Sequence, residues 1–249
     1  MRVALKLAWV EAKLLLRDPL TLVFSFGFPL TTLFVMAGVF GNSVEDRDEV
    51  VFRNVGAIDY YVPAYVALVI ASIGLISLPV HLASYRERGV LRRLRASELK
   101  PSSLLGAHVV VSYVLGALAG CVMTIAAMLV YGIGRPHSPL GVIAAFTLVS
   151  VMFSVIGYLL AMLLPTVRAA QIVGLILFFV MMMISGAGPP PEVLTPVMSF
   201  ISDLLPLTYA IRAIQDPWLN FGWSASTLLA NVGFLVVPAV VALRLGRLR

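Results

Sequence analysis

Charged residues are scarce in this chain of 249 residues. Asp, Glu, Lys and Arg together make up 12% of it, whereas a typical soluble domain carries about a quarter. Hydrophobic residues make up 60%, which is more than a water-soluble protein of this length can bury in one core. The composition therefore predicts an integral membrane protein.

Lysine is the rarest of the charged residues, because the chain has only Lys6, Lys13 and Lys100, and none of them follows a glycine. A P-loop needs Gly-x-x-x-x-Gly-Lys-Ser/Thr to surround phosphate groups, so no recognisable P-loop for ATP is present. The single cysteine, Cys121, excludes an intrachain disulfide, and no Cys/His cluster suggests a metal site. We expect no cofactor and no metal to be held by this chain.

The N-terminal sequence also does not have the pattern of a cleavable signal peptide, because charges interrupt its apolar residues too often for an h-region. The formal net charge is +6, which in a soluble protein would suggest a nucleic-acid partner. Here the charges fall at the ends of apolar runs, where they are better explained by membrane topology. We expect no nucleic-acid partner.

What the sequence does contain is a series of long apolar runs. Six stretches have no Asp, Glu, Lys or Arg and are each long enough to cross about 30 Å of hydrocarbon. We therefore predict an all-α, polytopic membrane protein with six transmembrane helices in a single domain, 1–249. The six stretches are 20–40, 62–84, 103–134, 138–167, 169–191 and 217–243.

The basic residues predict the orientation. With six spans and a cytoplasmic N-terminus, four of the 18 Lys and Arg residues fall on the outer side, and the other 14 fall in the cytoplasm. Cytoplasmic loops carry an excess of Lys and Arg, so both termini are predicted to be cytoplasmic. The four outer residues are Arg47, Arg53, Arg135 and Arg212.

Two segments outside the spans have helical patterns. Residues 1–18 alternate apolar and basic positions at helical spacing, which predicts an amphipathic helix lying on the membrane surface. Residues 189–216 follow an abrupt Gly- and Pro-rich end of the fifth span and contain too many breaks to cross the bilayer. They are predicted to form one or two short helices that re-enter the outer leaflet.

The spans show no residues that would power ion-coupled transport or catalyse a reaction. They contain no Asp, Glu, Lys or Arg for an ion relay, and His81 and His108 lie close to predicted cytoplasmic ends. Serines in the spans have no evident partner for nucleophilic catalysis, so an enzyme is not expected. A membrane scaffold or regulatory subunit without transport, and an intramembrane enzyme, are the alternatives to a transport subunit.

The densest charge run lies between the second and third spans, at 85–98. Arg88, Arg92 and Arg95 share one helical face, while Val90 and Leu94 belong to an apolar one. Glu87 precedes them, where a negative charge favours the start of a helix. A short amphipathic helix parallel to the membrane is predicted; an anchor on anionic lipid would explain its charge but not its ordered sequence.

That ordered sequence resembles a family motif. The chain resembles the permease subunits of type-2 ABC transporters, especially bacterial drug-resistance permeases of the daunorubicin/doxorubicin type. In that family the corresponding segment typically has threonine where this chain has Val90 and Pro-Leu where it has Glu98-Leu99. The resemblance covers nearly the whole chain and includes Leu205-Pro206-Leu207-Thr208-Tyr209, and its specific part is Glu87-Arg88-Gly89-Val90-Leu91-Arg92-Arg93-Leu94-Arg95-Ala96-Ser97.

The resemblance implies that residues 85–98 form a coupling helix, which docks on a separate ATP-binding subunit. Two copies of that subunit would hold ATP and Mg and drive export of a drug, a lipid or another hydrophobic or amphiphilic substrate, with multidrug or antibiotic resistance as the expected role. The arginines would bind carboxylates of the partner or lipid phosphates. The coupling residues it implies are Glu87, Arg88, Leu91, Arg92, Arg93 and Arg95.

The resemblance also implies a second permease, as a homodimer or as a heterodimer with a sister permease. The substrate path would lie between the two halves and be lined by the first, second and fifth spans. An aromatic and Met-rich lining would suit apolar cargo. The candidate path residues are Phe24, Phe28, Tyr65, Ser72, Phe178, Phe179 and Met182.

Overall fold

The computed structural model describes residues 9, 12–15, 17–41, 51–90 and 101–247, without the side chains of 101–105, 246 and 247. These residues form helices joined by turns, without a strand among them. Six helical segments are long and apolar enough to cross a membrane, which confirms the predicted polytopic all-α fold. They are Pro19–Phe40, Ala57–Glu87, Gly106–Tyr131, Pro139–Leu163, Val167–Ile184 and Ala225–Leu245.

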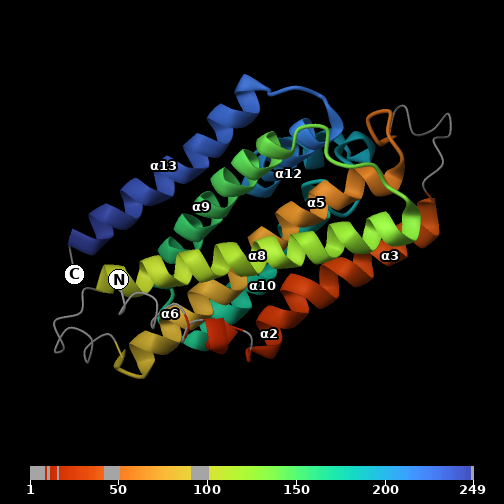
Figure 1. Cartoon of the computed structure of the whole chain (residues 1–249). Coiled ribbons are helices and arrows are strands. Elements are labelled where there is room, and N and C mark those ends of the chain that lie inside the picture. Colours follow the sequence, from red (N-terminus) through yellow and green to blue (C-terminus); the bar gives the residue numbers. More distant parts are fainter. Residues whose placement is uncertain (1–8, 10–11, 16, 42–50, 91–100, 248–249) are drawn as a thin grey trace.

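The first two spans are each interrupted by one turn of π-helix, a wider turn than that of an α-helix. Figure 1 shows the long helices running side by side as one bundle. In chain order the elements are α2 Pro19–Leu22, η1 Val23–Gly27, α3 Phe28–Phe40, α5 Ala57–Ser72, η2 Ile73–Ser77, α6 Leu78–Glu87, α8 Pro101–Tyr131, α9 Pro139–Leu163, α10 Val167–Ile184, η3 Pro191–Val193, α11 Pro196–Ser202, α12 Pro206–Leu219 and α13 Ala225–Arg247.

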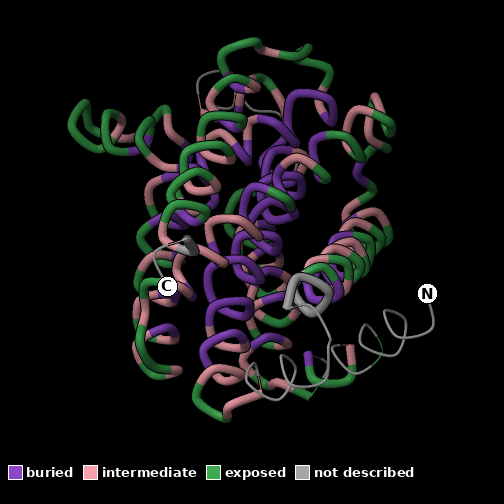
Figure 2. The backbone as a smooth tube through the Cα atoms, turned by 90° about the vertical axis from the view of Figure 1, so that its left-hand side faces the viewer, coloured by how far each residue is buried: buried purple, intermediate pink, exposed green. Residues whose placement is uncertain are grey.

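The second span, which comprises α5, η2 and α6, forms the centre of the bundle. Of its most apolar window 89% is buried, whereas the other five spans bury between 11% and 44% of theirs. Figure 2 shows the buried backbone along the middle of the molecule and the exposed backbone around it. The outer faces of the other spans are apolar, as expected for surfaces that contact lipid.

Two span boundaries differ from the charge-free windows. The second span is longer than 62–84, because it includes Asp59 near its start and Arg86 and Glu87 at its end. The window 217–243 joined two helices, since the turn between them carries no charge: Asn220, in the left-handed conformation with φ 64°, ends α12, and α13 begins only at Ala225.

The segment between the fifth and sixth spans forms two short helices. α11 and α12 meet at an angle of 80°. α12 is mostly buried. It is attached to α5 through Gln215, whose side-chain amide donates to the Tyr60 carbonyl at 3.1 Å. The backbone N–H groups of His137 and Ser138 donate to carbonyls at the end of α12, so the turn before α9 is attached to it as well.

The two π-helical turns occur in the same sequence context. Pro29 lies two residues after η1, and Pro79 lies two residues after η2. A proline inside a helix lacks an N–H donor, and its ring clashes with the carbonyl four residues earlier. A wider turn at this place relieves the clash. The Ser25 hydroxyl of η1 also lies 3.5 Å from that of Ser72, the last residue of α5 before η2.

Glycines let two other spans approach η2 closely. A Cβ atom on Gly157 of α9 would overlap the carbonyl oxygen of Gly74, and one on Gly174 of α10 would overlap that of Leu75. Apolar burial gives little net attraction between helices in lipid, so close backbone packing through small residues is an important source of their association. α9 and α10 therefore hold the central span at its π-helical turn.

We predict that Gly157→Ala destabilises the protein by about 1–3 kcal/mol, because the added methyl group meets backbone that cannot move aside. Gly120→Ala in α8 is the matched control, since its Cβ would lie 3.5 Å from the Val66 side chain, an ordinary contact. Thermal unfolding in detergent measures both. Equal unfolding temperatures for the two variants would contradict this packing.

Candidate functional site

The end of the central span is held to two neighbouring helix ends. The Arg86 guanidinium donates to the Ala161 carbonyl at 3.1 Å and to the Leu164 carbonyl, both at the end of α9. The Glu87 carboxylate accepts from the Val167 N–H at 2.9 Å, at the start of α10. A cation at a helix C-terminus and an anion at a helix N-terminus both complement the helix dipole. The two side chains thus join α6 to the α9–α10 turn.

The contact of Glu87 with α10 was not expected from sequence. Glu87 is the last residue of α6, and its carboxylate accepts from the first N–H group of α10, while the coupling role expected for it stays a prediction. Arg88 is exposed, and the chain turns at Gly89 with φ 67°. The other predicted coupling residues, Leu91, Arg92, Arg93 and Arg95, lie outside the described residues, as does most of the N-terminal segment 1–18.

Four of the predicted path residues form one aromatic cluster. Phe24 lies in η1, Phe28 begins α3, and Phe178 and Phe179 are neighbours in α10. Their ring centroids lie 5.4–5.9 Å apart, and most pairs meet edge to face, the geometry that aromatic rings prefer. Phe178 is fully buried, whereas Phe179 is 39% exposed. The cluster therefore extends from the core to the surface of the bundle between the first and fifth spans.

The remaining path residues lie inside the bundle. Tyr65 is fully buried and stacks on Tyr61, with ring centroids 5.5 Å apart. Ser72 is 1% exposed, and its hydroxyl donates to the Val69 carbonyl at 2.8 Å. Met182 is buried beside the aromatic cluster on α10. None of these three is at the surface of the described structure.

A chain of polar contacts that the sequence analysis missed crosses from the first span to the second. The Thr21 hydroxyl contacts the Asp18 carboxylate at 2.6 Å and the Ser77 hydroxyl at 2.7 Å. Ser77 lies in η2 and also lies 3.5 Å from the His81 ring. Asp18 precedes Pro19 and so falls just outside the first apolar run, but the distant serine could not be paired with it from sequence.

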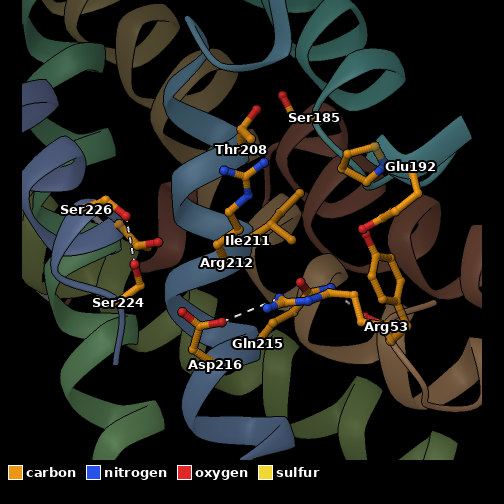
Figure 3. A pocket seen from close by; sticks show the side chains of 13 residues that line it. Arg53, Ser185, Glu192, Thr208, Ile211, Arg212, Gln215, Asp216, Ser224 and Ser226 are labelled. Carbon is orange, nitrogen blue, oxygen red and sulfur yellow. Dashed lines mark hydrogen bonds and ion pairs between the residues drawn. The ribbon is translucent and has the colours of Figure 1, made fainter. Parts of the chain in front are cut away.

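A polar cavity of about 310 Å³, also missed, lies between α12, the start of α13 and the turns after α10 and before α5 (Figure 3). Arg53 and Asp216 pair across it at 3.4 Å. Burial raises the pKa of the Asp216 carboxyl above its ordinary value, although the Arg53 guanidinium lowers it. The sequence predicts only that Arg53 and Arg212 lie on the outer side, because it does not show that the segments carrying them converge.

No group of three or more potential metal ligands occurs within the described part of the chain. The main polar features described above are the α6 contacts at one end of the bundle, the hydroxyl contacts beside the π-helical turns, and the cavity at the other end.

Comparison with protein families decides the class. The family model described as the ABC-2 type transporter matches residues 4–217, which is most of the chain. This chain belongs to the ABC-2 type transporter family. No curated protein matches the chain. The resemblance to type-2 ABC permeases is confirmed, and the narrower resemblance to drug-resistance permeases stays a prediction.

As an ABC-2 permease, the chain is a transport subunit that works with an ABC ATP-binding subunit. The matched region ends within α12, so α13, the sixth span, lies beyond it. The region includes the end of α6, the aromatic cluster and most of the cavity-lining residues.

We predict that Glu87→Ala lowers the free energy of unfolding of the isolated permease by about 1 kcal/mol, because the Val167 N–H at the start of α10 loses its carboxylate acceptor, whereas Thr166 still caps the helix. Glu87→Gln keeps an acceptor oxygen and should cost less. Arg88→Ala, a change at the exposed neighbour, is the control and should have little effect. Thermal unfolding without the ATP-binding subunit is the measurement.

A different result would assign the Glu87 carboxylate to docking alone. If Glu87→Ala left the unfolding of the isolated permease unchanged and reduced only its binding to the ATP-binding subunit, the carboxylate would act on the partner and not on α10.

Proposed function

We propose that this permease is the transmembrane half of an ATP-driven exporter that moves a hydrophobic or amphiphilic substrate, such as a drug or a lipid, out of the cytoplasm or the inner leaflet. The observation that carries the proposal is the family match on a six-span chain whose sequence lacks a P-loop. A permease without an ATP site of its own needs a motor on a separate chain.

The assembly we propose contains two permease copies and two ATP-binding subunits, with ATP and Mg held by the latter. The two permeases are identical or are sister chains, and the path lies between them. The surface position of Phe179, beside Phe24 and Phe28, supports a path at the first and fifth spans. Apolar aromatic surface there suits a substrate with a large apolar part.

The orientation we propose places both termini in the cytoplasm of a bacterial cell and the permease in its plasma membrane. The excess of basic residues supports it, because 14 of the 18 lie in the two terminal segments or in the connections after the second and fourth spans. The cytoplasmic side then includes the end of α6, so the coupling helix at 85–98 would follow directly from the contacts of Arg86 and Glu87. Drug or antibiotic resistance would be the physiological role.

In this account the motor acts on α6 and, through it, on two further spans. A push on residues 85–98 would reach the central span and also the α9–α10 turn, because Arg86 and Glu87 join them. The tilt of α10 would then move Phe178 and Phe179 relative to the first span.

We predict that reversing Arg92 and Arg93 to Glu abolishes association with the ATP-binding subunit or uncouples its ATP hydrolysis from export. Reversing two arginines replaces attraction to partner carboxylates with repulsion. The measurement is co-purification from membranes together with export from cells. The control is the double reversal Arg244→Glu/Arg247→Glu near the C-terminus, which changes the charge equally on the same proposed side and should leave assembly intact.

Normal assembly and normal export by the Arg92→Glu/Arg93→Glu variant would overturn the coupling-helix assignment. Loss of assembly in both double variants would instead point to a general effect of charge and would also count against it.

A further inference from the structure

The polar cavity beside α12 has the composition of a binding site for a dipolar ligand. Its charged lining comprises two guanidinium groups and two carboxylates, from Arg53, Arg212, Glu192 and Asp216. The rest of its polar lining consists mainly of hydroxyl and amide groups from α5, α12, α13 and the turn after α10. The lining thus carries both signs of charge in equal number.

The charges are only partly satisfied by one another. Arg53 pairs with Asp216 and lies over the Phe221 ring at 4.2 Å. Arg212 pairs with Asp203 at 3.5 Å, where the carboxylate is half exposed, and its guanidinium lies 5.7 Å from the centroid of the Tyr209 ring. Glu192 forms no ion pair with any described residue. One partly paired basic group on α12 and one acidic group on η3 (Pro191–Val193) therefore line the cavity.

A buried hydroxyl in the same wall also lacks a partner. Ser185 is 1% exposed, and its Oγ atom has no hydrogen-bond partner among the described residues. It lines the cavity from the end of α10, and Glu192 lines it from η3 (Figure 3). A buried polar group without a partner costs free energy, so an unpaired hydroxyl in the wall of a cavity that also carries a carboxylate indicates a place for a polar ligand group, from which the hydroxyl can accept.

The surroundings of the cavity are apolar. Phe221 and Trp223 lie in the turn next to the cavity-lining Ser224, and both are exposed. Val193, which follows Glu192, is 55% exposed, and α11 carries further exposed apolar side chains. Aromatic side chains of this kind concentrate at the membrane–water interface. The cavity therefore has a polar interior and an apolar rim, which matches an amphiphile with a small polar head.

The size of the cavity limits that head. A volume of about 310 Å³ is at the lower end of the range for small-molecule sites, so it holds a polar fragment, while any long chains lie outside. An ammonium group offers three donors, which Glu192 and Ser185 can accept, and a phosphate accepts from Arg212. A quaternary ammonium group has no N–H donor and would leave the Ser185 hydroxyl without one.

We propose that this cavity binds the headgroup of a zwitterionic phospholipid with a primary ammonium group, as in phosphatidylethanolamine. The phosphate lies against Arg212 and the ammonium against Glu192 and Ser185, with the acyl chains along the exposed apolar side chains of the 193–223 segment. The site lies on the outer side of the membrane in the orientation proposed above, and the binding itself does not depend on export.

Lipid retention by the purified permease tests the proposal. The protein in detergent is titrated with phosphatidylethanolamine, its N,N-dimethyl derivative and phosphatidylcholine, which carry the same phosphate and progressively fewer N–H donors. Native mass spectrometry counts the bound lipid, and phosphatidylglycerol is the anionic comparison. Retention should fall along the series, and phosphatidylglycerol should bind no better than phosphatidylcholine.

Variants locate the site. Glu192→Gln and Arg212→Gln should each weaken retention of phosphatidylethanolamine about tenfold, since each removes one charge-assisted hydrogen bond. Ser185→Ala should reduce the preference for the primary ammonium. Arg135→Gln, a change at an exposed arginine outside the cavity, is the matched control and should bind as the natural protein does.

Equal retention along the methylation series, stronger retention of phosphatidylglycerol, or full retention by Glu192→Gln would each overturn the proposal. Should a variant fail to fold, the methylation series on the natural chain still decides the headgroup. Because the ATP-binding subunit is absent from this assay, a negative result leaves the export proposal untouched, and loss of export with normal lipid retention would count against export alone.

Discussion

Close backbone packing around the π-helical turn at Ile73–Ser77 is the constraint on which the rest of the bundle depends. In hydrocarbon, apolar burial between helices removes no surface from water, so helices associate through van der Waals packing and through hydrogen bonds between polar groups. Gly157 and Gly174 place the backbones of α9 and α10 against carbonyls of this turn. The hydroxyl contacts from Thr21 and Ser25 bring the first span to the same place. Four spans therefore meet at one turn.

The two ends of the bundle have different chemistry. At the end of α6, Arg86 and Glu87 bind backbone groups of α9 and α10, so a load applied there reaches three spans together. At the other end, α12 packs against α5, α9 and α13, and the polar cavity lies beside α12 and the start of α13. The aromatic cluster of the first and fifth spans lies between these ends. The central span links the two, because it begins beside Gln215 and ends at Glu87.

Much of this architecture could be predicted from sequence, because the thickness of the bilayer sets the length of each apolar span. Six apolar runs long enough for the bilayer give six spans, and the break-rich segment after the fifth gives two short helices. The family resemblance, and no physical rule, named Phe24, Phe28, Phe178 and Phe179 as path residues, and their packing into one cluster is a finding of the structure. The start of the sixth span could not be placed, since the turn at Asn220 carries no charge to mark it.

Contacts between distant residues could not be predicted, because no local pattern encodes them. Glu87 precedes an arginine-rich segment and was expected to act on that segment or on a partner, yet it binds Val167, which is 80 positions away. The cavity joins Arg53 to Asp216 across 163 positions. The π-helical turns had a local signal in Pro29 and Pro79, but the glycines that pack on one of them come from other spans.

We propose that this permease converts work done by another chain into transport. Reconstitution of the purified permease into liposomes, alone and with the ATP-binding subunit that co-purifies with it, tests this, with ATP hydrolysis and ATP-dependent movement of a fluorescent amphiphile as the measurements. We expect neither activity for the permease alone and both for the complex. ATP hydrolysis by the permease alone, or ATP-independent transport by the complex at an undiminished rate, would contradict it.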